Sequence, residues 1–274
     1  MTASEVHLPV SIPELLELLK RNPQLLLFAG GTGILREKGS RFIDLPPSIA
    51  LLDNVAELRT VTRTERYVEL GSGLRLSEIL SFKQGTIAPI LREAIAGIAN
   101  PVIRNLATLG GNLACRERFM DSWSALACLD ALLEIREPSG SHWMNVNRLI
   151  GETGKPALPP VMVISRIRVP VDSWPFILVR KLGQAGWPGD DTWTFAALAK
   201  IDKGYLVDLR LAMGGRCGLR FPELDSRLEG SSLPLGTKEV VALVADYREA
   251  AWELDPDAAL PFSRMADLAL GKLR

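Results

Sequence analysis

Cysteine and histidine are scarce in this chain. Its 274 residues include three cysteines, Cys115, Cys128 and Cys217, and two histidines, His7 and His142. Three scattered cysteines are too few for a disulfide framework, and no CxxC pair provides the usual spacing of a zinc or iron–sulfur site. Two distant histidines also give no Ser-His-Asp or Cys-His arrangement. The sequence therefore argues against a metal site on this chain and against nucleophilic catalysis.

An excess of one charge and a long apolar run are also missing. The 32 basic residues balance the 32 acidic ones, whereas binding to a phosphate backbone needs concentrated Lys and Arg. The charge-free stretch at 22–35 is interrupted by glycines and falls short of the ~20 apolar residues that span a bilayer. No basic segment precedes an apolar one near residue 1, so no signal peptide is expected. We therefore predict no nucleic-acid partner, no membrane span and a cytoplasmic location.

What the sequence does contain is the composition of a globular protein, with 47% hydrophobic and 23% charged residues, and enough length for one large domain or two smaller ones. Helical periodicity predicts helices at 12–21, 34–38, 76–82, 88–98, 121–129, 238–252 and 262–273. Strands are predicted at 25–29, 42–45, 67–71, 132–136, 142–146, 161–169, 176–182, 192–200 and 205–213. This mixture of helices and hairpins indicates the α+β class, and two prolines in 170–175 suggest a domain boundary.

A glycine-rich segment, Gly30-Gly31-Thr32-Gly33, follows a predicted apolar strand and precedes a predicted helix. In this context backbone N–H groups can converge on a phosphate, because glycine has no Cβ to block a close approach. The start of a helix adds about 0.3–1 kcal/mol of favourable field for an anion. The segment is neither a Walker A loop nor GxGxxG. A plain tight turn explains these glycines equally well.

A second glycine segment, Thr108-Leu109-Gly110-Gly111-Asn112, also has two interpretations. Gly-Gly and Gly-Asn are common hairpin-turn dipeptides. Alternatively, the Thr and Asn side chains and the glycine backbone hold another part of the same ligand. Asp121 follows nine residues after Asn112, and the two glycine segments with this acid are more specific together than either segment alone.

In this order and spacing, the motifs resemble the flavin subunits of molybdenum hydroxylases, which are the medium, FAD-binding chains of the xanthine dehydrogenase and carbon monoxide dehydrogenase type. The resemblance rests on 27–32 (LFAGGT), 103–112 (IRNLATLGGN), Asp121 and 125–131 (ALACLDA). It covers almost the whole chain. Beyond about residue 170 it is weaker, and there 180–183 (RKLG) and 211–215 (LAMGG) resemble the small carboxy-terminal domain of the family.

The resemblance implies an α+β fold in which a two-subdomain FAD-binding part of the PCMH/VAO type precedes a small α+β carboxy-terminal domain. The FAD-binding domain would comprise residues 1–170, with subdomains at about 1–55 and 56–170. The carboxy-terminal domain, similar to that of carbon monoxide dehydrogenase flavoproteins, would comprise residues 175–274.

The resemblance also implies FAD as the cofactor and assigns its contacts by position. The segment around the diphosphate would be Leu27, Phe28, Ala29, Gly30, Gly31, Thr32, Gly33 and Ile34. A second clamp would consist of Thr108, Gly110, Gly111 and Asn112. Asp121 would lie near the ribose and diphosphate, Ile98 near the adenine, and Lys181 on the flavin side. No catalytic residue and no metal ligand is assigned.

The implied function is that of an oxidoreductase subunit. Partners would be a molybdopterin-binding large subunit and a [2Fe–2S] small subunit, and electrons would pass through FAD to NAD⁺ or another acceptor.

Two alternatives stand beside this hypothesis. Gly33 occupies a position where the family often has Asp, and bulky or charged residues fill 116–120. These departures suggest a relative that has lost FAD and acts as a structural or assembly subunit, unless the side chains at 116–120 point to solvent. The other alternative is a free-standing flavin reductase. Residues 187–191 are interpreted as an exposed turn.

Overall fold

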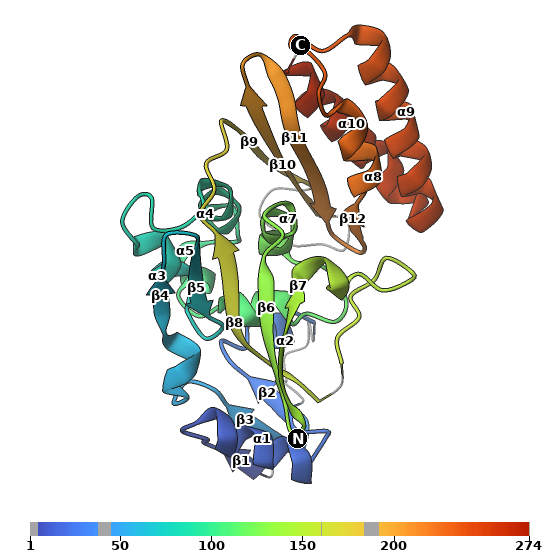
Figure 1. Ribbon diagram of the computed structural model, residues 1–274. Helices are drawn as coiled ribbons and strands as arrows, with labels where there is room; N and C mark the ends of the chain where they lie inside the picture. Colours follow the sequence, from blue (N-terminus) through green and yellow to red (C-terminus); the bar gives the residue numbers. More distant parts are fainter. Residues whose placement is uncertain (1–4, 38–44, 160, 184–191, 274) are drawn as a thin grey trace.

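The structure is a computed structural model that describes residues 5–37, 45–159, 161–183 and 192–273. Three β-sheets succeed one another along the chain, and helices lie between and beside them (Figure 1). The first sheet holds β1 (Glu5–His7), β3 (Ser48–Leu51) and β2 (Leu26–Phe28), parallel and in that order. Helix α1 (Ile12–Arg21) packs on it, and α2 (Thr32–Glu37) follows β2.

Helix α1 shows why this part of the chain folds as it does. The Ser11 hydroxyl accepts a hydrogen bond from the N–H of Glu14, which caps the first turn. Leu15 and Leu19 are four residues apart, so they share one face of the helix, and both are buried. They pack with Ala50 of β3 in a small core of their own.

The second sheet has five antiparallel strands in the order β4-β5-β8-β6-β7. Their bounds are β4 (Val61–Arg63), β5 (Tyr67–Gly71), β8 (Val163–Pro170), β6 (Leu132–Glu137) and β7 (Gly140–Asn145). The short helices η1 (Ala56–Arg59) and η2 (Val146–Leu149) flank it. Alternation along the strands sends Val68 and Leu70 into the core and turns Glu69 to the opposite, charged face.

Five helices accompany the apolar face of the second sheet: α3 (Leu76–Ser81), α4 (Pro89–Ala96), α5 (Pro101–Arg104), α6 (Leu109–Leu113) and α7 (Asp121–Cys128). In α7, every residue from Ser122 to Cys128 is buried. Figure 1 shows α7 between the second sheet and the third. A helix that is buried on all sides needs small, apolar side chains, or hydrogen-bond partners within the protein for its polar ones.

The third sheet is antiparallel, with β9 (Phe176–Leu182), β10 (Trp193–Asp202), β11 (Tyr205–Gly214) and β12 (Gly218–Arg220) in the order β12-β11-β10-β9. After it come α8 (Pro222–Asp225), η3 (Ser226–Leu228), α9 (Thr237–Leu254) and α10 (Pro256–Gly271). Residues 193–199 of strand β10 are all buried, because both faces of the strand are covered there. Phe195 packs in the core that includes α9 and α10, whereas Ala196 belongs to the core around α7.

The predicted elements at 12–21, 67–71 and 176–182 agree with the structure. The predicted strand at 42–45 and the turn at 187–191 fall wholly or largely outside the described residues. The prediction that the last helix begins at residue 262 is wrong, because α10 begins at Pro256 and accommodates Pro261 within it. The short strands β1, β3, β4 and β12 were not predicted, since three or four residues carry too little periodicity.

No helix in the described part of the chain is both long enough and apolar enough to cross a membrane. Among the same residues, no group of three or more His, Cys, Asp or Glu side chains is arranged to hold a metal ion.

Candidate functional site

The first glycine segment connects β2 to α2. Leu27 and Phe28 end the strand, and Thr32 begins the helix that includes Gly33 and Ile34. Between them, Gly31 has φ +68°, a conformation that favours glycine, and a Cβ there would lie 2.3 Å from the Phe28 ring. As at any helix start, the first N–H groups of α2 have no acceptor within the helix.

Gly30 brings the first segment to the second. A Cβ at Gly30 would lie only 1.8 Å from the carbonyl oxygen of Leu106, so the two backbones touch here. Leu106 is two residues before Thr108, which begins the second glycine segment. The structure therefore places segments about eighty residues apart in the chain directly beside each other. Only a residue without a side chain permits this approach at Gly30.

Gly33 differs from Gly30 and Gly31. It is exposed, and a Cβ at this position would meet no heavy atom of the described residues within 4 Å. The structure therefore imposes no steric need for glycine here, and an aspartate would fit equally well. The departure at Gly33 leaves the shape of the turn unaffected.

The second glycine segment is a helix start and not a hairpin turn. The Thr108 hydroxyl caps α6 by accepting a hydrogen bond from the N–H of Gly111 at 3.1 Å. The N–H of Leu109 donates to Leu74 O, and that of Gly110 donates to Ser72 O at 2.7 Å. These three N–H groups are therefore already bonded within the chain. The Thr108 hydroxyl can accept and donate at once, so it keeps a donor for a ligand.

Gly110 and Asn112 have internal partners. A Cβ at Gly110 would lie 2.5 Å from Ser72 Cβ, so glycine allows the turn after β5 to pack against α6. The buried Asn112 side chain accepts hydrogen bonds through Oδ1 from the hydroxyl of Ser122 at 2.5 Å and from its N–H at 3.2 Å. Asn112 thereby fixes the start of α7, the helix that carries Asp121.

Asp121 and Lys181 meet across the contact between α7 and the third sheet. Lys181 Nζ lies 3.0 Å from Asp121 Oδ1, and it also donates to Gly97 O at 3.5 Å. The Thr194 hydroxyl donates to the same Asp121 oxygen at 2.5 Å. These residues line a cavity of about 180 Å³ together with Glu93, Ala94 and Val179.

Ile98 lies next to this cavity but turns its side chain into the core. Only 4% of its surface is exposed, and it belongs to the apolar cluster beneath the second sheet. Its carbonyl accepts a hydrogen bond from Arg104 Nη1 at 2.6 Å. The neighbouring Gly97, and not Ile98, lines the cavity.

Thr194, Glu93 and Gly97 were not identified from the sequence. The signal for Thr194 is its register, since it is the direct antiparallel partner of Lys181 between β9 and β10. That register could not be derived from the sequence, because the long connection between the strands does not fix it.

The unusual residues at 116–120 are used inside the chain. Arg118 and Phe119 are buried, which contradicts the interpretation that this run points to solvent. Arg118 donates to the carbonyl of Thr192, and the Phe119 ring lies 4.3 Å from the Trp123 ring, centroid to centroid. Arg116 is exposed and donates to Leu158 O and Pro159 O. These contacts join the segment after α6 to the start of β10, to α7 and to the segment before β8.

A larger cavity of about 640 Å³ lies elsewhere, between α1, η1 and the charged face of the second sheet. Its lining includes Glu57, Glu134, Arg136 and Arg166, and none of the sequence-predicted site residues. Glu134 and Arg166 already pair with each other, Nε to Oε2, at 2.7 Å. The larger cavity therefore holds none of the residues that the sequence predicts for the cofactor, whereas the smaller one is lined by Asp121 and Lys181.

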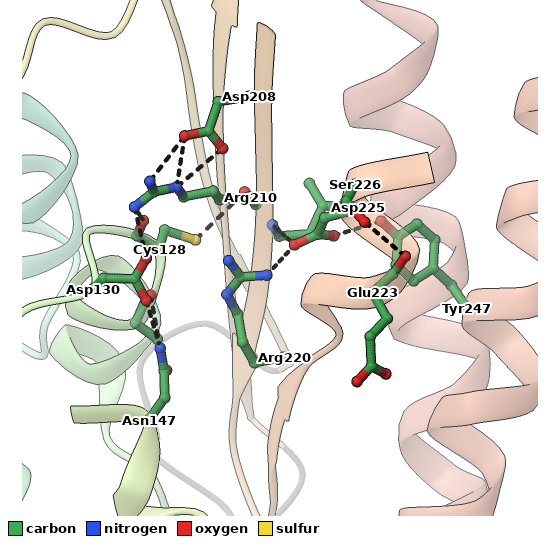
Figure 2. Close-up of polar contacts among 12 residues, drawn as sticks. Cys128, Asp130, Asn147, Asp208, Arg210, Arg220, Glu223, Asp225, Ser226 and Tyr247 are labelled. Carbon is green, nitrogen blue, oxygen red and sulfur yellow. Dashed lines mark hydrogen bonds and ion pairs between the residues drawn. The ribbon is translucent and has the colours of Figure 1, made fainter. Parts of the chain in front are cut away.

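A second polar cluster joins the third sheet to α7 on one side and to α9 on the other (Figure 2). Arg210 donates to Asp208, to Asp130 Oδ2 at 2.8 Å and to the carbonyl of Cys128 at 3.2 Å. Arg220 pairs with the buried Asp225, which also accepts from the Tyr247 hydroxyl at 2.5 Å.

Burial raises the pKa of Asp225 to about 6 despite its hydrogen bonds from Arg220 and Tyr247. Asp225 joins Arg220, Tyr247 and the N–H of Leu211, so we interpret this cluster as one that holds the third sheet against α9.

Comparison with known proteins identifies the family. Residues 2–172 match the family described as the FAD binding domain in molybdopterin dehydrogenase. The chain belongs to this family. The match includes both glycine segments and Asp121.

Relatives are similar over most of their length. The chain is 29% identical to the xanthine dehydrogenase FAD-binding subunit of Escherichia coli O157:H7, over 86% of this chain and 82% of that protein. It is 25% identical to the nicotine 6-hydroxylase medium subunit of Paenarthrobacter nicotinovorans, over 82% of this chain and 80% of that one.

Solved structures show the same fold. A chain of carbon monoxide dehydrogenase from Hydrogenophaga pseudoflava has a TM-score of 0.84 at 22% identity, covering 99% of this chain and 97% of that one. A chain of quinoline 2-oxidoreductase from Pseudomonas putida 86 has a TM-score of 0.82 at 19% identity, with coverage of 99% and 97%.

These findings confirm three predictions: the α+β fold of an FAD-binding part with a carboxy-terminal α+β domain, FAD as the cofactor, and a subunit of an FAD-dependent oxidoreductase. The residues fit such a cofactor. The contact of Gly30 with Leu106 brings the two glycine segments together, and the start of α2 and the Lys181 ammonium group are features that suit an anionic dinucleotide.

Proposed function

We propose that this chain is the flavin subunit of a molybdenum hydroxylase complex, with a molybdopterin-binding large subunit and a [2Fe–2S] small subunit as partners. When bound, FAD supplies the redox chemistry, accepting electrons from the iron–sulfur clusters and passing them to NAD⁺ or another acceptor. Family membership and relatives named as FAD-binding or medium subunits support this proposal. The observation that carries it is the contact of Gly30 with Leu106, which unites the two glycine segments.

In this proposal the chain binds and orients the cofactor. Residues 27–34 present the start of α2 to the diphosphate, with the Thr108 hydroxyl as a further donor. Gly110, Gly111 and Asn112 form the second clamp mainly by holding Thr108 and α7 in place, because their own described contacts are internal.

Asp121 and Lys181 would serve the ribose and flavin sides of the cofactor, respectively. A carboxylate accepts hydrogen bonds from ribose hydroxyls, and an ammonium group stabilises negative charge nearby. Ile98 would act on the adenine side through the position of its backbone, since its side chain is buried.

We also propose a division into domains at 1–170, with subdomains at about 1–55 and 56–170, and at 175–274. The separate apolar cores around α1 and around α9 with α10 support it, whereas the core around α7 takes residues from both sides of the boundary, Ala196 among them. The cytoplasmic location stays a prediction from the sequence.

The test is a flavin titration of the purified chain. We expect one FAD per chain with micromolar or tighter affinity, followed by visible absorbance, and co-purification with the two partner subunits when the three genes are expressed together. A chain that takes up no FAD, alone or in the complex, would contradict the proposal and favour a structural role. NAD(P)H oxidation by the isolated chain would favour a flavin reductase.

A further inference from the structure

Thr194 lies where the third sheet meets the cofactor site. It is buried, with 3% of its surface exposed, on the doubly covered strand β10. Its hydroxyl donates to Asp121 Oδ1 at 2.5 Å, and Lys181 Nζ approaches the same oxygen to 3.0 Å. One carboxylate oxygen therefore holds two donors, both supplied by the third sheet.

The register of the third sheet places these two donors together. Thr194 and Lys181 are direct partners in the antiparallel ladder between β10 and β9. Directly opposed residues project from the same face of a sheet, about 5 Å apart. The hydroxyl and the ammonium group therefore reach Asp121 from one side.

Helix α7 is itself tied to Thr194 by a second bond. The Ser124 hydroxyl donates to the carbonyl of Thr194 at 2.6 Å. Asp121 and Ser124 are three residues apart, so they lie on the same face of α7. The main chain of Thr194 is thus fixed relative to α7, and its hydroxyl meets Asp121 in one defined position.

We infer that Thr194 is a positioning residue of the FAD site: it orients the Asp121 carboxylate, which in turn holds the Lys181 ammonium group at the 180 Å³ cavity. The inference rests on the proposed roles of Asp121 and Lys181. It gives the carboxy-terminal part of the chain two residues in the site, only one of which was recognisable from the sequence.

The substitution Thr194→Val removes the hydroxyl and keeps the branched shape. The Asp121 carboxylate then loses a hydrogen bond that orients it. Because hydrogen bonds to charged groups are among the stronger ones, we expect FAD to bind roughly tenfold more weakly. The visible spectrum of bound FAD should change in the same direction as in Asp121→Ala. Thr194→Ser keeps the hydroxyl and should restore FAD affinity to within about twofold of the wild type.

Thr62→Val is the matched control. Thr62 also lies on a strand and donates to a carboxylate, Glu69 Oε2 at 3.4 Å, but none of the proposed cofactor contacts involves it. This variant should bind FAD like the wild type. If Thr194→Val does not yield folded protein, Thr194→Ala removes the same hydroxyl with less bulk, and the same expectations apply to it.

A double-mutant cycle decides whether Thr194 acts through Asp121. In an Asp121→Ala background, Thr194→Val should weaken FAD binding no further, because the group it orients is gone. An unchanged FAD affinity in Thr194→Val, or an equal further loss in the Asp121→Ala background, would overturn the inference. Wild-type protein and Thr62→Val that bind no FAD would instead overturn the proposed function, and this inference with it.

Discussion

Gly30 and Gly33 are three residues apart in one segment, but they face different surroundings. A side chain at Gly30 would overlap the Leu106 carbonyl, whereas one at Gly33 would point into open space. The glycine at position 30 therefore serves the contact between two backbones. The glycine at position 33 serves no contact that the structure shows.

This contrast predicts opposite outcomes for the same substitution. Gly30→Ala should lower the free energy of unfolding by about 1–3 kcal/mol and weaken FAD binding at least tenfold, since Leu106 and the second segment must move. Gly33→Ala, in the first turn of α2, should leave FAD affinity unchanged and stability equal or slightly higher. Urea denaturation and flavin titration measure both. Equal effects of the two variants would contradict this account of the turn.

The three thiols should differ in reactivity. Burial raises the pKa of Cys128 and of Cys217 to about 12, so both remain protonated near neutral pH. Cys115 is only partly buried. With iodoacetamide, the folded protein should be alkylated at Cys115 alone, and slowly, because burial raises the pKa of this thiol too. Mass spectrometry of tryptic peptides gives the readout, and the urea-unfolded chain, which should react at all three, is the control.

At the scale of elements, α7 determines how the site is assembled. A helix with no exposed face needs a partner for each polar side chain. Asp121, Ser124 and Cys128, at positions i, i+3 and i+7, all point toward β10. They contact the Thr194 hydroxyl, the Thr194 carbonyl and the Ala196 carbonyl, respectively. This polar stripe fixes how α7 sits against β10 within an otherwise apolar interface.

Removing the Ser124 hydroxyl, in the middle of this stripe, should lower the free energy of unfolding. Ser124 donates to Thr194 O and accepts from the N–H of Gly214 at 2.9 Å. Ser124→Ala removes a buried hydrogen bond from each of two backbone groups, so we expect a loss of about 2–4 kcal/mol in unfolding free energy. The control is Ser263→Ala, which removes a buried hydroxyl that donates to Leu260 O within its own helix. If Ser124→Ala lowers the unfolding free energy by less than ~1 kcal/mol, the polar stripe does not hold α7 against β10.

The charged face of the second sheet predicts that the stability of the folded protein depends on pH. Burial acts to raise the pKa of Glu134, but hydrogen bonds from Arg166 and Ser165 outweigh it and lower the pKa overall. The folded state then binds protons less readily than the unfolded chain. Its stabilisation is therefore present above the ordinary Glu pKa of ~4.3 and is lost as pH falls below it.

Glu134→Gln should remove this part of the acid sensitivity. Its unfolding free energy should be lower than that of the wild type at pH 7, and the gap should narrow as pH falls toward 3, as followed by urea denaturation. Glu223→Gln, at an exposed position, is the control and should follow the wild type throughout. A difference in unfolding free energy between wild type and Glu134→Gln that stays constant with pH would contradict the lowered pKa of Glu134.

For the whole molecule, the contact between α7 and the third sheet determines the arrangement of its parts. The cofactor site takes Asp121 from one side of this contact and Lys181 with Thr194 from the other. At the opposite end of α7, Arg210 donates to Asp130 and to the Cys128 carbonyl (Figure 2). Its guanidinium group also lies 4.8 Å from the centre of the Trp174 ring. Trp174 lies between β8 and β9, so Arg210 also anchors the connection between the sheets.

Loss of Arg210 should loosen this contact. Asp208 and Asp130 are partly exposed, at 26% and 42% of their side chains, so water would compensate part of the loss. For Arg210→Met we expect about 1–2 kcal/mol of destabilisation and weaker FAD binding, because Lys181 is held by the same contact. Arg227→Met, which removes an exposed ion pair with Asp246, should change stability by under ~0.5 kcal/mol. Calorimetry and flavin titration together test this.

Local signals predicted much of the fold. Helix α1 followed from its cap and leucine spacing, and β5 and β9 from their apolar runs between turns. The start of α10 was misplaced because Pro261 resembles a helix boundary, although the surrounding packing tolerates one missing hydrogen bond. Of the site, the glycine segments, Asp121 and Lys181 were recognised as motifs, whereas the internal partners of Gly110, Asn112 and Ile98 were not.

The scarcity of cysteine and histidine and the order of the glycine motifs are properties of the sequence alone. The first argued against a metal site on this chain, and the second carried the family resemblance that implied an FAD-binding subunit. Only the tertiary structure decided which glycines are sterically required, that the first N–H groups of α6 are already bonded, and that Thr194 joins Asp121 and Lys181. The reason is physical. A motif records local backbone needs, but a contact between distant segments depends on sheet register and helix packing, which no short stretch of sequence contains.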